Sequence, residues 1–322
     1  MPHQGSNVEA LALSPDSRRL VSSGGHALTI WNIDDGYPVK VVELEGHTDI
    51  VDACTWSPDG ALIASASWDS TVRIWDGHTY QQRDLLSIVD ASPDSEFQSV
   101  RKQSLRFSPD ARYLAWISGV FMRSQCFIWQ PLMDGQPKML GPHPDHRGVY
   151  TAAFSFDGES RHIATSNKNF DNDLHVCTVR IWDAATGAPI AVLTGHSNTV
   201  SSISFSPDGK SLFSMDDDMS MRVWDCGTWS GKQTGVLRDA KHRSSDWSWW
   251  YVRGSDGQYV ATGSAKGLVR LWRTSDGECV ASFDEHDSFV IRQMISPNSQ
   301  FLVYGNTKGI VRIRSLSEFI GE

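Results

Sequence analysis

The sequence predicts an all-β protein, a seven-bladed β-propeller in which each blade is a four-stranded antiparallel sheet. Two landmarks that recur along the chain predict this fold, and no segment of any length shows a helical hydrophobic period. The repeats cover nearly all 322 residues. We therefore expect residues 1–322 to form a single domain.

The first landmark is a Ser and a Pro-Asp-type turn at the end of a short apolar strand. In the second repeat, Ser57 precedes Pro58-Asp59-Gly60, an order that suits a tight turn between antiparallel strands. Successive copies lie 41 to 51 residues apart, which is enough chain for one blade. The Ser of this landmark stands at Ser14, Ser57, Ser108, Ser155, Ser206, Ser255 and Ser296.

The second landmark is an aliphatic residue followed by Trp, which marks the end of each expected third strand. In the second repeat the expected strands are 51–56, 61–67 and 71–75, all short and rich in β-branched or aromatic residues. Such a sheet cannot bury both faces alone, but seven stacked around an axis can. The landmark Trp stands at Trp31, Trp75, Trp129, Trp182, Trp224 and Trp272, and Arg314 replaces it in the seventh repeat.

Charge and composition limit the classes of partner. The chain has 29 Lys and Arg against 38 Asp and Glu, a formal net charge of −9. This balance argues against a protein that binds the phosphate backbone of nucleic acids. No apolar run approaches the length of a membrane span. We therefore expect neither a nucleic acid nor a membrane as partner.

Cysteine usage and the first residues point to a reducing compartment. The five cysteines are scattered and form no Cys-x-x-Cys pair, and the N-terminal residues show no signal-peptide pattern. We expect buried, reduced thiols. The expected location is the cytoplasm, the nucleus or both.

Short motifs within the repeats resemble those of the WD-repeat β-propeller family. They are the Gly-His before a first strand, the Ser-Pro-Asp-Gly turn, and the endings Val72-Arg73-Ile74-Trp75-Asp76 and Val179-Arg180-Ile181-Trp182-Asp183. Seven matched copies make the resemblance specific. It implies a protein–protein interaction scaffold.

The resemblance also implies a buried hydrogen-bonded tetrad of His, Ser or Thr, Asp and Trp in each well-formed blade. A Ser-His-Asp set could suggest catalysis, but this set recurs with a Trp as fourth member and can satisfy its own polar groups, so we interpret it as structural. Elsewhere the set decays, with Lys266 and Lys308 at the Asp place and Tyr304 at a Ser place. The two full sets are His47, Ser65, Asp69 and Trp75 in blade two, and His196, Ser214, Asp218 and Trp224 in blade five.

Closure of the ring is the weak point of this assignment. The family usually takes the outer strand of the last blade from the N-terminus, whereas here the first blade opens at Val8. Only residues 1–7 precede it, and only 315–322 follow Arg314. We expect the outer strand of blade seven to be very short or absent. That leaves a weakly closed ring or a chain cut from a longer protein.

The candidate partner-binding residues lie around the central channel and on one face, the top. Trp68 and Trp247 are expected in top-face loops, while Trp249 is expected in the core. Since the channel positions mix carboxylates and aromatics, a peptide with a basic or apolar anchor would suit them, although a water-filled channel without a guest is the alternative. The channel positions are Glu9, Asp52, Gln103, Tyr150, Ser201, Trp250 and Ile291.

No motif for catalysis or cofactor binding is present. The chain lacks a phosphate-binding loop, a His-Glu-x-x-His and a Gly-x-Ser-x-Gly. Asp216-Asp217-Asp218 lacks the Gly and later Glu of a calcium loop. We therefore expect no catalytic residue, no metal and no cofactor.

These observations favour a non-catalytic scaffold that binds a partner peptide or domain through the top face and central channel. We expect a monomeric propeller within a larger complex. The alternative is a regulatory or sensor propeller of a larger signalling protein of the nucleotide-switch receptor type. A channel-centred propeller enzyme is less favoured.

Overall fold

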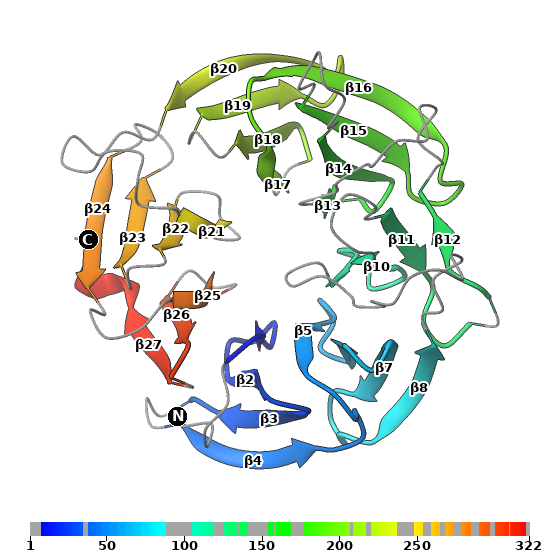
Figure 1. Ribbon diagram of the computed structural model, residues 1–322, viewed down its shortest axis with the longest axis vertical. Helices are drawn as coiled ribbons and strands as arrows, with labels where there is room; N and C mark the ends of the chain where they lie inside the picture. The colour runs from blue at the N-terminus through cyan, green and yellow to red at the C-terminus, as the bar shows by residue number, and fades with distance from the viewer. Residues whose placement is uncertain are drawn as a thin grey trace.

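Seven antiparallel sheets surround a central axis in the computed structural model (Figure 1). This arrangement confirms the predicted seven-bladed β-propeller. Six sheets have four strands and the seventh has three among the residues that the structure describes. Those residues are 8–34, 38–87, 105–118, 125–133, 135–140, 154–157, 159–168, 177–206, 209–216, 220–236, 248–253, 259–264, 268–273, 278–284, 290–296, 300–308 and 310–319.

Within each sheet the strands follow chain order from the axis to the perimeter. Blade one contains β1 (Leu11–Leu13), β2 (Arg19–Gly24), β3 (Ala27–Asn32) and β4 (Val39–Leu44). Blade two contains β5 (Val51–Trp56), β6 (Leu62–Ser67), β7 (Thr71–Asp76) and β8 (Gln82–Ser87). Blade three contains β9 (Arg106–Phe107), β10 (Leu114–Ser118), β11 (Gln125–Trp129) and β12 (Lys138–Met139).

The remaining blades repeat this order. Blade four contains β13 (Phe154–Phe156), β14 (His162–Lys168), β15 (Cys177–Asp183) and β16 (Pro189–His196). Blade five contains β17 (Val200–Phe205), β18 (Ser211–Asp216), β19 (Ser220–Asp225) and β20 (Ser230–Val236). Blade six contains β21 (Ser248–Arg253), β22 (Tyr259–Ser264), β23 (Leu268–Arg273) and β24 (Cys279–Asp284). Blade seven contains β25 (Val290–Ile295), β26 (Phe301–Asn306) and β27 (Val311–Ser315), and the short 3-10 helix η1 (Leu316–Glu318) follows.

The Ser-Pro-Asp turn is held by its own side chains. In blade two the Ser57 hydroxyl donates to the Asp59 carboxylate at 2.6 Å and accepts the N–H of Leu62 at 2.8 Å. Gly60 completes the turn with φ of +74°, a left-handed conformation that glycine adopts without strain. The recurring sequence therefore fixes the hairpin between the first and second strands.

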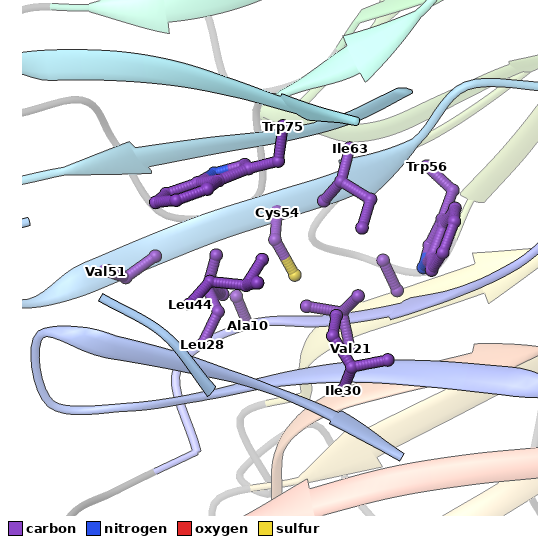
Figure 2. Close-up of a cluster of buried hydrophobic side chains, with 11 residues drawn as sticks. Ala10, Val21, Leu28, Ile30, Leu44, Val51, Cys54, Trp56, Ile63 and Trp75 are labelled. Atoms are coloured by element: carbon purple, nitrogen blue, oxygen red, sulfur yellow. The ribbon is translucent and has the colours of Figure 1, made fainter. Parts of the chain in front are cut away.

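Hydrophobic clusters between neighbouring blades form the core. At the junction of blades one and two, Leu28 and Leu44 face Val51, Ile63 and others (Figure 2). Equivalent clusters join blades two and three, three and four, four and five, and six and seven. A further cluster joins blade seven to blade one and contains Val8, Leu20 and Val303. Apolar packing therefore joins the last blade to the first.

The turns between third and fourth strands share an unusual backbone position. Gly187 occupies it in blade four with φ of +74°. Blades two and five place bulky residues there with φ of +62° and +51°, a region that costs such residues energy. They are Tyr80 and Trp229.

Both bulky residues contact the blade before their own. Arg19 of blade one donates a hydrogen bond to the Tyr80 hydroxyl. Trp229 lies edge-on to His162 of blade four, with 5.4 Å between ring centroids. These contacts offset the backbone cost.

Blade seven ends differently from the others. After β27 the chain turns through η1, and the N–H of Leu316 donates to the carbonyl of Gln300 at 2.7 Å. Phe319 then packs edge-on against Phe283 of β24 at 4.7 Å between ring centroids. The described end of the chain therefore lies against blade six and does not pair with β27.

Candidate partner-binding face

Strand direction defines the top face. Strands alternate in direction within each blade, so the turns from second to third strands share a face with the connections from fourth strands to the next blade. Trp68 lies in such a turn, between β6 and β7. The turns from third to fourth strands, including Met133, lie on the opposite face, the bottom.

Blade two brings together the four residues of its predicted tetrad. His47 Nδ1 lies 2.9 Å from Asp69 Oδ2, and His47 Nε2 lies 2.8 Å from Ser65 Oγ. Trp75 Nε1–H donates to the same Ser65 Oγ at 2.9 Å. The four groups therefore form a continuous chain from the core to the top-face turn.

This chain of hydrogen bonds is complete when the His47 imidazole is neutral. With the imidazole hydrogen on Nδ1, His47 Nδ1–H donates to Asp69 and Nε2 accepts the Ser65 hydroxyl, which in turn accepts Trp75 Nε1–H. Burial lowers the pKa of His47 below its usual 6.5, although the hydrogen bond to Asp69 and the charge of Asp69 act to raise it. Burial alone would raise the pKa of Asp69, but hydrogen bonds from Thr71, Thr48 and His47 bring it below its usual value.

Blade five builds the same chain with a different carboxylate. His196 Nε2 lies 2.6 Å from Ser214 Oγ, which accepts Trp224 Nε1–H at 2.8 Å. His196 Nδ1, however, lies 3.0 Å from Asp216 Oδ2. The sequence assigned this role to Asp218, which lies outside the described residues.

Alternation along β18 explains this correction. Residues two apart in a strand face the same side, so Asp216 lies on the face of Ser214, toward His196. Asp216 is fully buried, and its second oxygen accepts the N–H of Ser220 at 3.0 Å. A carboxylate at this strand position reaches the imidazole, whereas blade two has the shorter Ser67 there.

Other blades keep parts of the chain. The landmark Trp donates to a Ser or Thr hydroxyl in blades one and four, where Trp31 bonds Ser22 at 2.7 Å and Trp182 bonds Thr165 at 2.9 Å. In blade three Trp129 donates instead to the carbonyl of Gly135 at 3.0 Å. The hydrogen bonds of the tetrad are therefore retained to different extents in different blades.

In blade seven both partners of the Ser–Trp pair are replaced. Arg314 Nε donates to the Tyr304 hydroxyl at 3.4 Å, and its guanidinium lies over Phe283 at 5.8 Å from the ring centroid. The Tyr–Arg pair thus takes the place of Ser–Trp.

Inner strands carry a β-bulge at the predicted channel positions. The pairing register shifts at Asp52 in β5, Ser201 in β17 and Ile291 in β25. A bulge locally interrupts pairing and redirects the chain. These three sequence-predicted residues therefore occupy one equivalent place in their blades.

In blade six the equivalent place belongs to Trp249, not to Trp250 as the sequence predicted. The register runs from Ser248 to Trp250 across the bulge, which leaves Trp249 unpaired. The reason is that Gly254 stands where the other repeats have the turn Ser, so that alignment on Ser255 shifted this strand by one residue.

Trp68 and Asp52 meet at the top of blade two. Trp68 Nε1–H donates to Asp52 Oδ2 at 2.9 Å, and Trp68 N–H donates to the carbonyl of Ile50 at 2.9 Å. Asp52 is fully buried, whereas Trp68 is 41% exposed. An indole fixed at both its backbone and its ring nitrogen therefore presents a large face to solvent.

The remaining predicted residues divide by what the structure describes. Glu9 is buried and lies two residues before β1 of blade one. Tyr150, Trp247 and Gln103 lie outside the described residues. Sequence reasoning named Trp68 and Asp52 separately but missed their hydrogen bond, because their separation of 16 residues reflects the hairpin register rather than any local pattern.

Metal-binding and membrane features were also sought in the described part of the chain. It contains no group of three or more His, Cys, Asp or Glu that could hold a metal ion. No helix there is long and apolar enough to cross a membrane. All five cysteines are free thiols, and burial raises the pKa of the Cys126 thiol.

Comparison with known proteins gives a family match over nearly the whole chain. A family model described as the IFT122 first beta-propeller matches residues 7–315. The nuclear distribution protein PAC1 of Arthroderma otae is 28% identical over 234 residues, which are 71% of this chain and 40% of PAC1. The WD repeat-containing protein SL1-17 of Schistosoma mansoni is 29% identical over 206 residues, 64% of this chain and 60% of that protein.

A third relative is much longer than this chain. The rat apoptotic protease-activating factor 1 is 24% identical over 295 residues, which are 91% of this chain and 21% of that protein. The chain thus spans less than two thirds of the length of each of these three relatives.

Proposed function

Because the chain belongs to the WD-repeat β-propeller family, within which it matches the IFT122 first beta-propeller, we propose that it is a non-catalytic interaction scaffold. It binds a partner peptide or domain through the top face and central channel. Residues 1–322 act as one domain in this proposal. Fold alone names no partner, so the proposal depends on the residues of the face.

The exposed, fixed indole of Trp68 is the observation that carries this proposal. Aromatic anchors dominate the binding energy of protein interfaces when they are held rigidly and lose solvent on binding. The Trp68 ring is oriented by Asp52 before any partner arrives. Little conformational entropy is then lost on association.

The proposed interface extends from Trp68 around the channel. It includes Glu9, Asp52, Ser201 and Ile291 of the inner strands, with Trp249 in the place first assigned to Trp250. Tyr150 as a channel residue and Trp247 as a top-face residue remain part of the proposal. Two buried carboxylates beside aromatic residues suit a peptide with a basic or apolar anchor.

The proposed cellular location and class of partner follow from the charge of the sequence and from the free thiols. Five free cysteines fit the reducing environment of the cytoplasm or nucleus. The acidic net charge of −9 favours a protein partner over a nucleic acid. We propose a monomeric propeller within a larger complex.

Substitution of Trp68 tests the top face. Partners cross-linked to the wild-type chain are identified and then titrated against the Trp68→Ala variant. Loss of an aromatic anchor is expected to weaken binding by about 2 kcal/mol, or about thirtyfold. Trp68→Phe, which keeps a ring but loses the N–H that Asp52 orients, is expected to give an intermediate loss.

Met133→Ala is the matched control. Met133 is 64% exposed and lies on the bottom face, so its truncation removes exposed apolar surface away from the proposed site. Thermal unfolding of each variant checks that the ring is intact. Unchanged affinity of a folded Trp68→Ala protein for every partner would contradict the top-face proposal.

A second proposal is a regulatory propeller of a larger signalling protein. Its support is the similarity to the apoptotic protease-activating factor, of which the matched segment is 21%. A reading frame that continues from this propeller into a nucleotide-binding segment would support it, and a frame without one would favour the simple scaffold.

A further inference from the structure

The turn between β6 and β7, which carries Trp68, is bonded to the connection between β4 and β5. At the start of the turn, Ser67 Oγ donates to the Asp49 carbonyl at 2.9 Å. Trp68 N–H donates to the next carbonyl of the connection, that of Ile50, also at 2.9 Å. Two successive residues of the turn therefore bond two successive carbonyls of the connection.

Asp69, the next residue of the turn, joins the same two segments through its carboxylate. Its Oδ2 accepts the N–H of Thr48 at 3.0 Å and lies 2.9 Å from His47 Nδ1. Its Oδ1 accepts the N–H of Thr71 at 2.9 Å and the hydroxyl of Thr71 at 2.6 Å. One carboxylate thus fixes the turn to the start of β7 and to the connection.

The connection and the turn therefore form a single hydrogen-bonded unit. Residues 47–50 of the connection each bond a residue within 67–69 of the turn. Hydrogen bonds that share partners support one another. Since Trp68 and Asp69 are adjacent, and consecutive Cα atoms stay about 3.8 Å apart, a displacement of Asp69 moves Trp68 as well.

The core of blade two holds this unit from below. His47, which bonds Asp69 through Nδ1, lies 2.8 Å from Ser65 Oγ through Nε2. Ser65 Oγ also accepts Trp75 Nε1–H at 2.9 Å. The position of the Asp69 carboxylate is therefore set by groups buried in the blade, and not by the surface of the top face.

Burial separates the groups that hold the turn from the group that a partner touches. The side chains of His47 and Asp69 are 1% and 5% exposed, whereas Trp68 is 41% exposed. A partner that covers the indole does not reach the imidazole. Any effect of His47 on binding is therefore exerted through the orientation of Trp68, whose ring N–H donates to Asp52 at 2.9 Å.

We propose that His47 and Asp69 are positioning residues for the partner-binding indole of Trp68. This inference rests on the proposed top-face function and identifies the residues that prepare its anchor. The tetrad of blade two holds the turn at Asp69, so the indole meets Asp52 in one orientation before a partner arrives. Without this hold, binding must also order the turn, and affinity falls. By linkage, a partner bound at Trp68 stabilises the tetrad in return.

The indole N–H of Trp68 reports its own orientation without any partner. Its resonance in the NMR spectrum of the full chain is assigned by its loss in Trp68→Phe. Asp69→Asn leaves one acceptor oxygen, which cannot serve both the connection and β7, and His47→Gln removes the imidazole. Each should speed exchange of the indole hydrogen with solvent by about tenfold or more. Thr71→Val, a milder change at a half-buried residue, should speed it less and serves where the buried variants do not fold.

His196→Gln is the matched control for His47→Gln. It removes the imidazole that bonds Ser214 and Asp216 in blade five, so it breaks the same kind of buried contact. Because blade five does not carry Trp68, exchange of the Trp68 indole should stay unchanged. Equal acceleration in both His variants would overturn the proposal, since general loosening of the ring would explain it. Unchanged exchange in every folded variant of blade two would overturn it too.

Titration of the partners cross-linked to the wild-type chain separates this proposal from the top-face function. Asp69→Asn should weaken binding by about three- to tenfold, less than Trp68→Ala, because the indole is still present but must be ordered on binding. His196→Gln should bind normally. Normal binding by Trp68→Ala would overturn both proposals. Weakened binding by Trp68→Ala together with normal binding by Asp69→Asn would overturn the positioning role alone.

Discussion

Blade two and blade seven are built from the same repeat but are held together differently. Blade two has four strands and a buried chain of four polar side chains that runs from Trp75 to Asp69. Blade seven has three described strands, and a Tyr304–Arg314 hydrogen bond stands at the corresponding place. The propeller thus tolerates loss of the polar chain, provided that apolar packing with both neighbours remains.

The apolar packing of the two blades is correspondingly similar. Val72 and Ile74 of β7 are fully buried, and in blade seven Val303 and Leu302 of β26 are fully buried. Burial of such side chains contributes about 1.5–3 kcal/mol each. Apolar contacts between blades therefore supply the stability that both blades share, and the buried hydrogen bonds of the tetrad add to it in blade two.

The largest expected effect comes from breaking the polar chain at its centre. Ser65→Ala removes the hydroxyl that both His47 and Trp75 use, and it leaves two buried polar groups without their partner. The free energy of unfolding should fall by about 3 kcal/mol, measured by urea denaturation. Tyr304→Phe, the equivalent change in blade seven, should cost about 0.5–1 kcal/mol.

Equal losses in the two variants would contradict the difference drawn between the blades. Far-UV circular dichroism of both proteins checks that the β-structure is retained. A comparable cost would mean that the Tyr304–Arg314 pair stabilises blade seven as strongly as the tetrad stabilises blade two.

A smaller effect is expected at the junction that closes the ring. A Cβ on Gly305 would lie 2.7 Å from Val8 Cγ1 of blade one, so Gly305→Ala forces the two blades apart. The expected loss is about 2 kcal/mol, read from the urea midpoint. Blade two already has Ala66 at the equivalent position, and Ala66→Gly should cost only about 1 kcal/mol.

Blade seven would prove more adaptable than the geometry implies if Gly305→Ala were as stable as the parent. A normal midpoint together with faster amide exchange in β26 would still locate the strain at this junction. A normal midpoint with unchanged exchange would contradict the prediction.

The smallest expected effect is a pH dependence that belongs to blade two. Burial holds the pKa of His47 below 6.5, so the unfolded chain takes up the proton first as the pH falls. The free energy of unfolding should therefore decline below about pH 6.5 and stay level above it. Tyr304 and Arg314 have no group that titrates in this range.

Urea denaturation at several pH values, with His47→Gln as the matched variant, isolates this contribution. The difference in stability between the two proteins should shrink as the pH falls from 7 to 5. A difference that grew over this range would show that the imidazole is charged in the folded protein. Asp69, whose pKa is also lowered, adds a loss only below its usual value of 3.8.

The sequence predicted the parts of this fold that depend on short-range signals. Ser57-Pro58-Asp59-Gly60 and Ile74-Trp75 each specify a turn or a buried strand end within a few residues. Fourth strands carry weaker signals because they lie on the perimeter, and Val39 and Val41 of β4 are exposed. Their pairing depends on the third strand rather than on their own pattern.

The candidate site was less predictable because it depends on register. Asp216 and Asp218 are two positions apart, so strand alternation alone does not tell which of them contacts His196. The structure shows that Asp216 does. The bulge position of blade six falls at Trp249 and not at Trp250, because a glycine replaces the turn Ser of this repeat. A shift of one residue moves every side chain to the other face, so a single misplaced landmark misassigns the channel.

The bulky turn residues on the bottom face bear on how such a ring can diverge. Tyr80 matches Arg19, and Trp229 matches His162, across the boundary between consecutive blades. A copied or transplanted blade would carry its Tyr or Trp to a neighbour without the matching residue and would keep only the backbone cost. Gly187 frees blade four of such a match with blade three, although His162 still matches blade four to blade five. Blades one and two, and blades four and five, are therefore fitted to each other as pairs, whereas a glycine at this turn requires no matching residue in the blade before it.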